Sequence, residues 1–352
     1  MIGLTQQFEF LVLVIVISTI FIVSYLIGRN KKDTIIRQFY ALGTVIQLRV
    51  YGTNGERAIQ EAIERLNDID DKMSVFKENS DVSMINKKAG ISSHQVSEDT
   101  YFVIKKAVEY SKLSEGTFDP TIRPIVSLWR IGSDNPKIPN KNEIAKNLKL
   151  VNYEDIILSG KDNSIGLRHE KQAIDIGGIA KGYAADEVKR IFENYKIKSA
   201  LIDLGGNIFA LGKKADKTLW NVGIQDPFNN RGEHVGLISV ENKSVVTSGN
   251  YERYFMKDGK VYHHIIDPKT GYPSESEIIS ATIISDYSID GDGLSTGVYI
   301  LGLEKSIELI QSLEGIDAIF ITQNKEIFIT SGIKDKFKIT NDEFTYKNNL
   351  LK

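Results

Sequence analysis

The sequence predicts an α+β fold that is rich in antiparallel strands. From residue 153 onward, short runs of β-branched and other apolar residues follow one another without a steady alternation of strand and helix. Such an order is typical of antiparallel sheets, because neighbouring parallel strands need a long crossover between them. Two segments with helical periodicity precede these runs, so we expect helices packed against the sheet.

The helical segments are recognised by the spacing of their apolar residues. Within 56–73, one face collects Ile59, Ala62, Leu66, Ile69 and Met73, as in an amphipathic helix. Weaker patterns of the same kind predict helices at 100–113, 181–195 and 289–313. Strands are expected at 35–51 with an interruption at Gly43, and at 155–158, 199–204, 219–225, 235–240, 278–285 and 316–322. Segment 135–147 contains two prolines and predicts a surface excursion.

Composition excludes several classes of protein. Of the 352 residues, 41% are hydrophobic and 26% are charged, and the formal net charge is −2. The chain can therefore bury a large core, and no broad basic face for nucleic acid is expected. The absence of cysteine excludes disulfides, thiolate metal sites, a cysteine nucleophile and a lipid-modified cysteine.

An apolar segment near the N-terminus predicts a membrane anchor. Residues 10–28 carry no charged side chain, and at ~1.5 Å per helical residue they nearly match the ~30 Å thickness of the hydrocarbon layer. The alternatives are a buried core helix or a cleaved signal peptide, but no A-x-A site precedes Arg29. We thus expect a flank at 1–9, the anchor at 10–28, a linker at 29–37, a catalytic body at 38–340 and a polar tail at 341–352.

Charges beside this segment leave its orientation open. Arg29, Lys31 and Lys32 follow it, which by the positive-inside rule would keep the body cytoplasmic. Long domains nevertheless cross membranes largely regardless of flanking charge. We expect a single-pass protein of the cytoplasmic membrane with an extracytoplasmic body.

Asp292 and Thr296 are spaced to share one face of a helix. A carboxylate and a hydroxyl are oxygen ligands, which suit Mg²⁺ or Ca²⁺ better than zinc. The alternative is that the aspartate caps the helix and the threonine is packed.

The segment D-I-G-G-I-A-K-G-Y at 175–183 combines exposed backbone with a lysine near a helix start. Gly177 and Gly178 would let the chain approach a ligand closely, and Lys181 could meet phosphate oxygens. It is neither a dinucleotide fingerprint nor a Walker loop. A plain strand-to-helix turn is the alternative.

Two adjacent histidines are candidates for acid–base chemistry. On a strand, His263 and His264 would face opposite sides, so only one can serve a given site. A hydrolase triad of Ser248, His264 and Asp267 can be written down, but the serine lacks a G-x-S-x-G elbow.

Taken together, the motifs resemble one family, the FAD:protein FMN transferases or ApbE family. The resemblance covers roughly residues 38–335. In chain order it rests on A-L-G-T at 41–44, M-S-V-F at 73–76, E-G-T-F-D-P-T-I-R-P at 115–124, D-I-G-G-I-A-K-G-Y at 175–183, L-I-D-L-G-G-N-I at 201–208, V-T-S-G-N-Y-E-R-Y-F at 246–255, H-I-I-D-P-K-T-G-Y-P at 264–273 and D-G-L-S-T at 292–296.

The resemblance implies a T-fold-related body and a Mg²⁺-dependent enzyme. Such an enzyme cleaves FAD, attaches FMN through a phosphoester to a threonine or serine of a target flavoprotein, and releases AMP. By motif matching, the metal would be held by Gly178, Asp292 and Thr296. Catalysis would depend on His264 and Asp292. The residues expected to bind FAD are Leu42, Val75, Phe76, Lys77, Asp119, Asp175, Lys181, His264 and Ile265.

The sequence departs from the family pattern at two single positions and in the metal motif. Leu42 replaces a methionine, Arg123 stands where a small residue is usual, and the metal motif reads G-D-G-L-S-T with Gly291 and Gly293 loosening the helix start. We expect metal binding to survive these changes.

The same motifs leave two other functions open. One is a Mg²⁺-dependent FAD pyrophosphatase that gives free FMN and AMP, and the other is a non-catalytic FAD-binding module. The acceptors implied by the resemblance carry D-x-x-[ST]-G-A-[ST] and are expected among membrane electron-transfer subunits. Within this chain the nearest match, 292–298, fails in its last three positions, so self-flavinylation is not expected.

Overall fold

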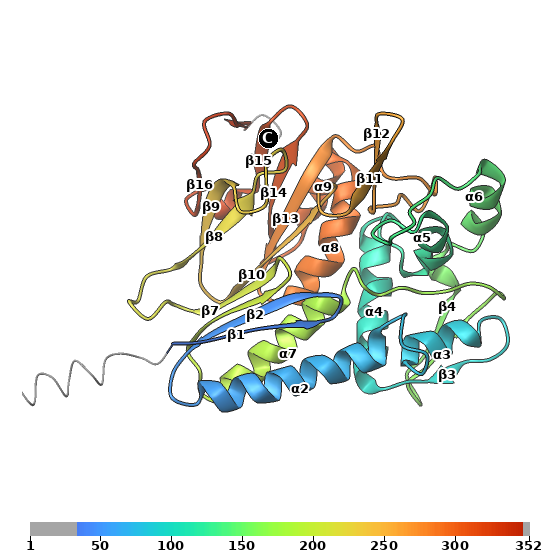
Figure 1. The fold of residues 1–352 in the computed structure, drawn as a ribbon, viewed down its shortest axis with the longest axis horizontal. Coiled ribbons are helices and arrows are strands. Elements are labelled where there is room, and N and C mark those ends of the chain that lie inside the picture. The colour runs from blue at the N-terminus through green and yellow to red at the C-terminus, as the bar shows by residue number, and fades with distance from the viewer. Residues whose placement is uncertain (1–33, 348–352) are drawn as a thin grey trace, which may run out of the picture.

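The computed structural model describes residues 34–347 and is organised around one nine-stranded sheet (Figure 1). Its strand order is β1-β2-β6-β7-β10-β13-β14-β15-β17, and every neighbouring pair is antiparallel except β15 and β17. These strands are β1 (Thr34–Ala41), β2 (Thr44–Tyr51), β6 (Ser199–Leu204), β7 (Asn207–Gly212), β10 (Lys243–Gly249), β13 (Ile278–Ser285), β14 (Asp317–Thr322), β15 (Glu326–Ile329) and β17 (Thr345–Tyr346).

Helices cover one face of this sheet and form the main hydrophobic core with it. The helices that contribute to this core are α2 (Gly55–Met73), α3 (Asp81–Lys87), α4 (Glu98–Leu113), α7 (Ala180–Asn194), α8 (Ser288–Leu301) and α9 (Leu303–Ser312). In α2 the buried positions include Ile59, Leu66 and Ile69, which follow one another at spacings of seven and three residues and therefore share one face. The predicted amphipathic helix is confirmed.

Glycines let α8 approach its neighbours closely. A Cβ on Gly293 would lie 2.3 Å from the ring of Tyr110 in α4, and one on Gly182 of α7 would lie 2.4 Å from the Ser288 carbonyl oxygen. Tyr110 also donates a hydrogen bond to Asp290. The glycines that seemed from the sequence only to loosen this helix thus allow its first turns to pack between α4 and α7.

The other face of the sheet is covered in part by a small antiparallel sheet. It consists of β16 (Phe337–Ile339), β9 (His234–Val240) and β8 (Trp220–Gln225), in that order. Between the two sheets lies a second core cluster, which extends as far as Leu201 of β6 and Tyr51 at the end of β2. Among the described residues, β1 contributes no member to this cluster.

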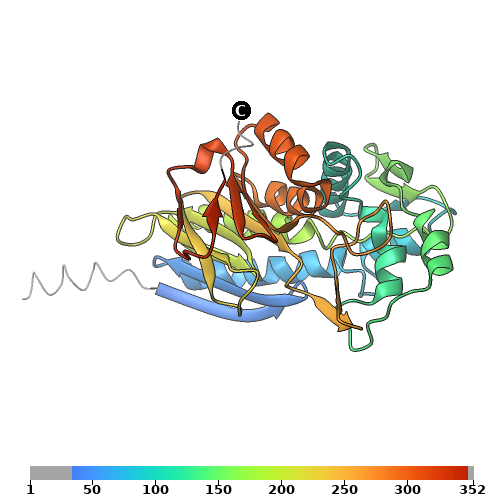
Figure 2. The same cartoon turned by 90° about the horizontal axis from the view of Figure 1, so that it is seen from above.

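The remaining elements lie around the other end of the molecule (Figures 1 and 2). They are β3 (His94–Gln95), β4 (Ile156–Ser159) and β5 (Ser164–Leu167), the hairpin of β11 (Tyr254–Lys257) and β12 (Lys260–His263), helices α5 (Arg123–Trp129) and α6 (Lys141–Leu148), and 3₁₀ turns at Pro120–Ile122 and Tyr153–Asp155. A further 3₁₀ turn, Ser331–Ile333, follows β15 and belongs to the second core cluster through Ile333. Trp129 donates a 2.8 Å hydrogen bond to the Gly271 carbonyl. This bond attaches the turn that follows His264 to α5.

The α+β fold class is confirmed, and two element predictions are wrong in detail. The helix expected at 289–313 is two helices, because Gly302 has φ 91° and separates α8 from α9. The excursion at 135–147 contains the start of α6, where Asn140 and Glu143 form a capping box. Polar capping therefore starts a helix there, directly after two prolines.

The folded body extends past both boundaries drawn from the sequence. β1 begins at Thr34, inside the expected linker at 29–37, and pairs with β2 along its whole length. Phe344 in the expected polar tail is buried in the second core cluster, and β17 pairs with β15. The predicted anchor at 10–28 lies outside the described residues. Within 34–347, no helix is long and apolar enough to span a bilayer.

The close approach of α8 and α4 predicts the effect of one substitution. Gly293→Ala would place a methyl group against the Tyr110 ring, and we expect it to lower the free energy of unfolding by about 1–3 kcal/mol, as for other overpacked cores. Chemical denaturation measures this. Gly223→Ala in β8 is the matched control, because its Cβ would lie 3.5 Å from His234; equal stability of the two variants would contradict the packing argument.

Candidate functional site

The candidate site forms where the first turn of α7 meets the first turns of α8. Asp292 of α8 is only 4% exposed. Its carboxylate accepts hydrogen bonds from the Gly182 backbone N–H at 2.9 Å and from the Lys181 Nζ at 3.1 Å. The same ammonium donates to the Gly177 carbonyl at 3.2 Å. A positive charge is therefore held between a buried carboxylate and a backbone oxygen.

Hydroxyl oxygens that could bind a cation lie one helical turn further along α8. The Thr296 hydroxyl is 3.2 Å from the Ser248 Oγ of β10, and Ser248 also donates to Ser295 at 2.9 Å. Asp292 and Thr296 occupy the same side of the helix, as their spacing predicts. The side-chain atoms of Asp292, Thr296 and Ser248 that could bind a metal are oxygens, which are the ligands that Mg²⁺ prefers.

This donor set fits a hard cation with few protein ligands. Within residues 34–347, no group of three or more His, Asp or Glu side chains could hold a metal, and at this position Asp292 would supply a carboxylate ligand. Mg²⁺ commonly binds one or two carboxylates and completes its shell with water and substrate phosphates. The carbonyl that the Lys181 ammonium contacts belongs to Gly177; the metal role of its neighbour Gly178 stays a prediction.

A second group of side chains lies beside the turn that precedes α7. Arg123 Nη1 donates to Asp175 Oδ2 at 3.1 Å, and Asp175 Oδ1 accepts from the Gly177 backbone N–H at 3.0 Å. The Arg123 guanidinium also lies 5.1 Å from the centre of the Phe76 ring, which is 84% exposed, in a cation–π contact. Arg123 thus links the segment at 74–80 to the turn at 175–178.

His264 is a half-buried histidine held in one tautomer. Its Nδ1 lies 3.2 Å from the Arg253 carbonyl oxygen, and since a carbonyl only accepts, Nδ1 carries the proton and Nε2 is the acceptor. Burial, the charge on Arg253 and, more weakly, the charge on Lys181 lower the pKa of His264 to about 4. At neutral pH the ring is therefore uncharged.

The adjacent histidine is structural. His263 is buried, and its Nε2 donates to the Ser274 carbonyl at 2.9 Å. Burial lowers its pKa as well, and its ring packs edge-on against Tyr299. The prediction that only one histidine is available to a site agrees with this geometry.

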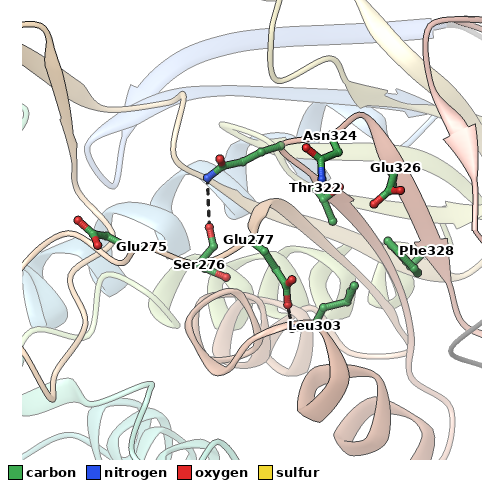
Figure 3. A pocket seen from close by; sticks show the side chains of 9 residues that line it. Glu275, Ser276, Glu277, Leu303, Thr322, Asn324, Glu326 and Phe328 are labelled. Carbon is green, nitrogen blue, oxygen red and sulfur yellow. Dashed lines mark hydrogen bonds between the residues drawn. The ribbon is translucent and has the colours of Figure 1, made fainter.

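A cavity of about 380 Å³ lies elsewhere, between the start of β13 and the ends of β14 and β15 (Figure 3). Its lining includes the carboxylates of Glu275, Glu277 and Glu326, and none of the predicted site residues. Glu277 accepts the Leu303 backbone N–H at 3.2 Å, as Figure 3 shows. Three carboxylates would repel a phosphate ester, so this cavity is not the candidate site.

Comparison with known proteins agrees with the motifs. The sequence model of the ApbE family matches residues 42–320. The chain belongs to the ApbE family. Curated relatives named FAD:protein FMN transferase include one from Treponema pallidum, 33% identical over 90% of this chain and 92% of its own length, and one from Klebsiella pneumoniae, 36% identical over 84% and 92%.

Solved structures place the ApbE fold on the same residues. The ApbE protein from Thermotoga maritima is 31% identical, with a TM-score of 0.79 over 86% of this chain and 99% of its own. A structure described as the flavin transferase ApbE from Vibrio cholerae is 25% identical, with a TM-score of 0.78 over the same shares. The predicted resemblance is confirmed.

The ApbE site residues predicted from sequence fall into two groups. Lys181 and Asp292 contact each other directly, whereas Thr296 lies one helical turn further along α8 and contacts Ser248. The charge on Lys181 contributes to the lowered pKa of His264. Asp175 joins them through the turn to Gly177. Their roles stay predictions, because the structure gives only their positions.

For the predicted flavin-lining residues, the observed contacts are with other protein groups. Lys77 pairs with Asp70 and Asp71, while Leu42 and Val75 pack on the main core and Ile265 is buried in it. Their roles toward FAD stay predictions too.

Asp119 is fully engaged within the fold. Its carboxylate accepts from the Thr121 N–H and hydroxyl at 2.7 and 2.6 Å and from the Tyr153 N–H at 2.9 Å. Burial raises the pKa of Asp119 to about 6, although these hydrogen bonds oppose the shift. In this geometry the residue caps a 3₁₀ turn and ties it to residue 153.

Sequence reasoning missed Ser248 and Arg253 as partners of the site. Ser248 was considered only for a hydrolase triad, although T-S-G-N-Y is one of the family motifs. Register explains its place: Ser248 pairs with Ala281 across β10 and β13, which sets it beside α8. The Arg253 contribution is a backbone carbonyl, and residue type gives no signal for that.

The electrostatics of the site predict how the pKa of His264 responds to Lys181. We expect Lys181→Gln to raise it, because a positive charge that disfavours the imidazolium is removed. NMR titration of the imidazole signals measures the change, with His264→Gln as the assignment control. Lys338→Gln, on the distant β16, should leave the value unchanged; a similar rise in both variants would show that the coupling to Lys181 is not specific.

Proposed function

We propose that this chain is a Mg²⁺-dependent FAD:protein FMN transferase. The observation that carries the proposal is the cation position at Asp292, with Lys181, Gly177 and Thr296 around it and a neutral histidine nearby. Membership of the ApbE family, with curated relatives named for this activity, supports the same reaction.

In the proposed reaction, the hydroxyl oxygen of an acceptor threonine or serine attacks the phosphorus of the FMN half of FAD. A new P–O bond forms, the bond to the bridging oxygen breaks, and AMP leaves with the electron pair of that bond. The hydroxyl proton passes to Nε2 of His264, which is free because Nδ1 is held by the Arg253 carbonyl. Every atom of FAD ends in the FMN ester or in AMP.

Positive charge at the site would oppose the charge that builds on the phosphates. Asp292, Thr296 and a carbonyl of the 177–178 turn would hold Mg²⁺, which supplies a Lewis acid for the pyrophosphate oxygens. The Lys181 ammonium, now paired with Asp292, can turn to a phosphate oxygen once the carboxylate has another cation. Its position at the start of α7 also adds the helix N-terminus.

The nucleotide itself would lie along the predicted FAD-binding residues. The exposed Phe76 ring is held by the Arg123 guanidinium and offers its outer face to a planar ring system. Because Arg123 also pairs with Asp175, its positive charge contacts both the turn at 175–178 and the ring of Phe76.

Mass spectrometry tests the transferase directly. The full-length chain, FAD and Mg²⁺ are incubated with a domain that carries D-x-x-T-G-A-T, and we expect the acceptor to gain the mass of FMN minus water. Asp292→Ala should slow the reaction on the order of 10²–10³-fold, as when a group that stabilises transition-state charge is lost. Asp286→Asn, an exposed aspartate paired with Lys243, is the control.

Other products would decide between the remaining functions. Free FMN and AMP without modification of the acceptor would establish the pyrophosphatase, in which water takes the place of the acceptor hydroxyl at the same site. Intact FAD bound to the protein, with no turnover on several acceptor domains, would establish the binding module.

The pKa of His264 sets the expected pH dependence. A ring with a pKa of about 4 is neutral at pH 7 and is protonated only as the pH falls through about 4. If neutral Nε2 accepts the proton, kcat/KM should be flat with respect to this group above about pH 6 and fall below pH 5. His264→Gln should remove this acid limb and slow transfer ~10²–10⁴-fold. An unchanged limb in that variant would assign it to another group.

We further propose a single-pass membrane protein with an extracytoplasmic body that modifies membrane electron-transfer flavoproteins. The apolar segment at 10–28 supports the anchor. Fusing a reporter that is active only outside the cytoplasm to residue 352 should give activity, whereas a reporter active only inside should be silent. The opposite pattern would place the body in the cytoplasm.

A further inference from the structure

The β1–β2 hairpin has two different faces. Side chains alternate along each strand, so one face carries Phe39, Ile46 and Leu48 toward the helices and the main core. Its opposite face is fixed by the register: Tyr40 pairs with Val45, Gln38 with Gln47 and Ile36 with Arg49. We call these six residues the outer face of the hairpin.

Three of the six residues of this outer face are apolar and exposed in the described structure. Tyr40 is 72% exposed, Val45 51% and Ile36 44%. Further along the same side of the sheet, the strands are covered by β8, β9 and β16, but that cover ends at Tyr51 and Leu201. Exposed large apolar side chains on an edge hairpin indicate a binding surface.

The charge of the outer face is suited to anions. None of its six residues is acidic, and the Nε of Arg49 is buried without a hydrogen-bond partner among the described residues. A carboxylate follows only on the next strand, where Asp203 lies opposite Gln47 and accepts the Gly206 N–H at 2.8 Å. Aromatic and aliphatic side chains beside the basic residue Arg49 match the interface between hydrocarbon and phosphate headgroups.

The chain before β1 identifies the occupant. The predicted membrane segment ends at residue 28, and β1 begins at Thr34. Residues 29–33 can span at most about 18 Å when extended, at ~3.3–3.6 Å per residue. Three of them, Arg29, Lys31 and Lys32, are basic. The start of the hairpin must therefore stay close to any bilayer that holds the segment.

We propose that the outer face of the β1–β2 hairpin rests on the surface of the lipid bilayer that holds the predicted anchor. The inference rests on the proposed anchor, and it adds a defined orientation of the body. β1 has eight residues and so carries the chain about 26 Å along the surface. Its turn at Leu42 packs on the main core, and in Figure 1 the turn end lies beside the start of α7. The candidate site would thus be held at a fixed place near the membrane.

Site-specific labelling of the full-length protein tests this orientation. Because the chain contains no cysteine, single-cysteine variants can each carry one environment-sensitive fluorophore. Tyr40→Cys and Val45→Cys report on the outer face, and Ser18→Cys reports on the predicted anchor. Gln311→Cys is the control, since it is exposed on α9, which packs on the opposite face of the sheet. Each labelled protein is reconstituted in vesicles of phosphatidylcholine and phosphatidylglycerol, with and without lipids that carry a quencher.

We expect quenching and a blue shift at positions 18, 40 and 45, and neither at 311. Quenching at 18 without quenching at 40 and 45 would overturn the inference while the anchor stands. No quenching at 18 would remove the anchor and the inference together. A blue shift at 40 and 45 that is the same with and without quencher lipids, and that disappears when the protein is diluted, would show that a second copy of the chain covers the face. That result would also overturn the inference.

Failure of this inference and failure of the proposed function are separable. The labelled variants are assayed for FMN transfer in the same vesicles, and retained transfer also shows that each variant is folded. Transfer with no quenching at 40 and 45 would count against the orientation alone. Quenching without transfer by the unlabelled wild-type chain would count against the function alone.

Discussion

The candidate site depends on one buried carboxylate. Asp292 is enclosed where α7 and α8 cross, and it is held by the Gly182 N–H and the Lys181 ammonium. A charge in that position is tolerated only when it is paired and hydrogen-bonded. The crossing is close enough for these bonds because residue 182 has no side chain: a Cβ there would lie 2.7 Å from the Cβ of Asp292. The close contact between Gly182 and Asp292 therefore both packs α7 against α8 and stabilises the buried charge.

The groups around this carboxylate are of two kinds: backbone groups with fixed positions and side chains that can rotate. Backbone groups, such as the Gly182 N–H and the Gly177 carbonyl, are set by the helix start and the turn before it. Lys181 and Arg123 are flexible side chains whose charges are balanced by Asp292 and Asp175. The protein thus keeps its cations inside the site before any phosphate arrives, and exchanging partners requires only rotation of side chains.

Local patterns were enough to predict most of the architecture. Periodicity located α2, and the runs at 199–204 and 278–285 match β6 and β13. Spacing alone placed Asp292 and Thr296 on one face. The break at Gly302 was missed because the pattern of apolar residues continues through it, and only the backbone angle of 91° separates the helices.

What the sequence could not supply was the pairing of distant segments. Ser248 reaches Thr296 through the register of β10 against β13, and Arg123 reaches Phe76 across segments far apart in the chain. Nor could residue type show that a backbone carbonyl, that of Arg253, fixes the tautomer of His264. The motifs supplied candidate residues, while tertiary contacts decided which atoms face one another.

The turn between β1 and β2 carries a further consequence. It has two residues, Leu42 and Gly43, with φ of 52° and 70°. This conformation suits asparagine or glycine, and a leucine there is strained by roughly 1 kcal/mol. The Leu42 side chain also packs against the main core, so an apolar contact offsets part of this backbone strain. The corner therefore couples the conformation of the hairpin to the packing of the core, and a change in either one would be felt by the other.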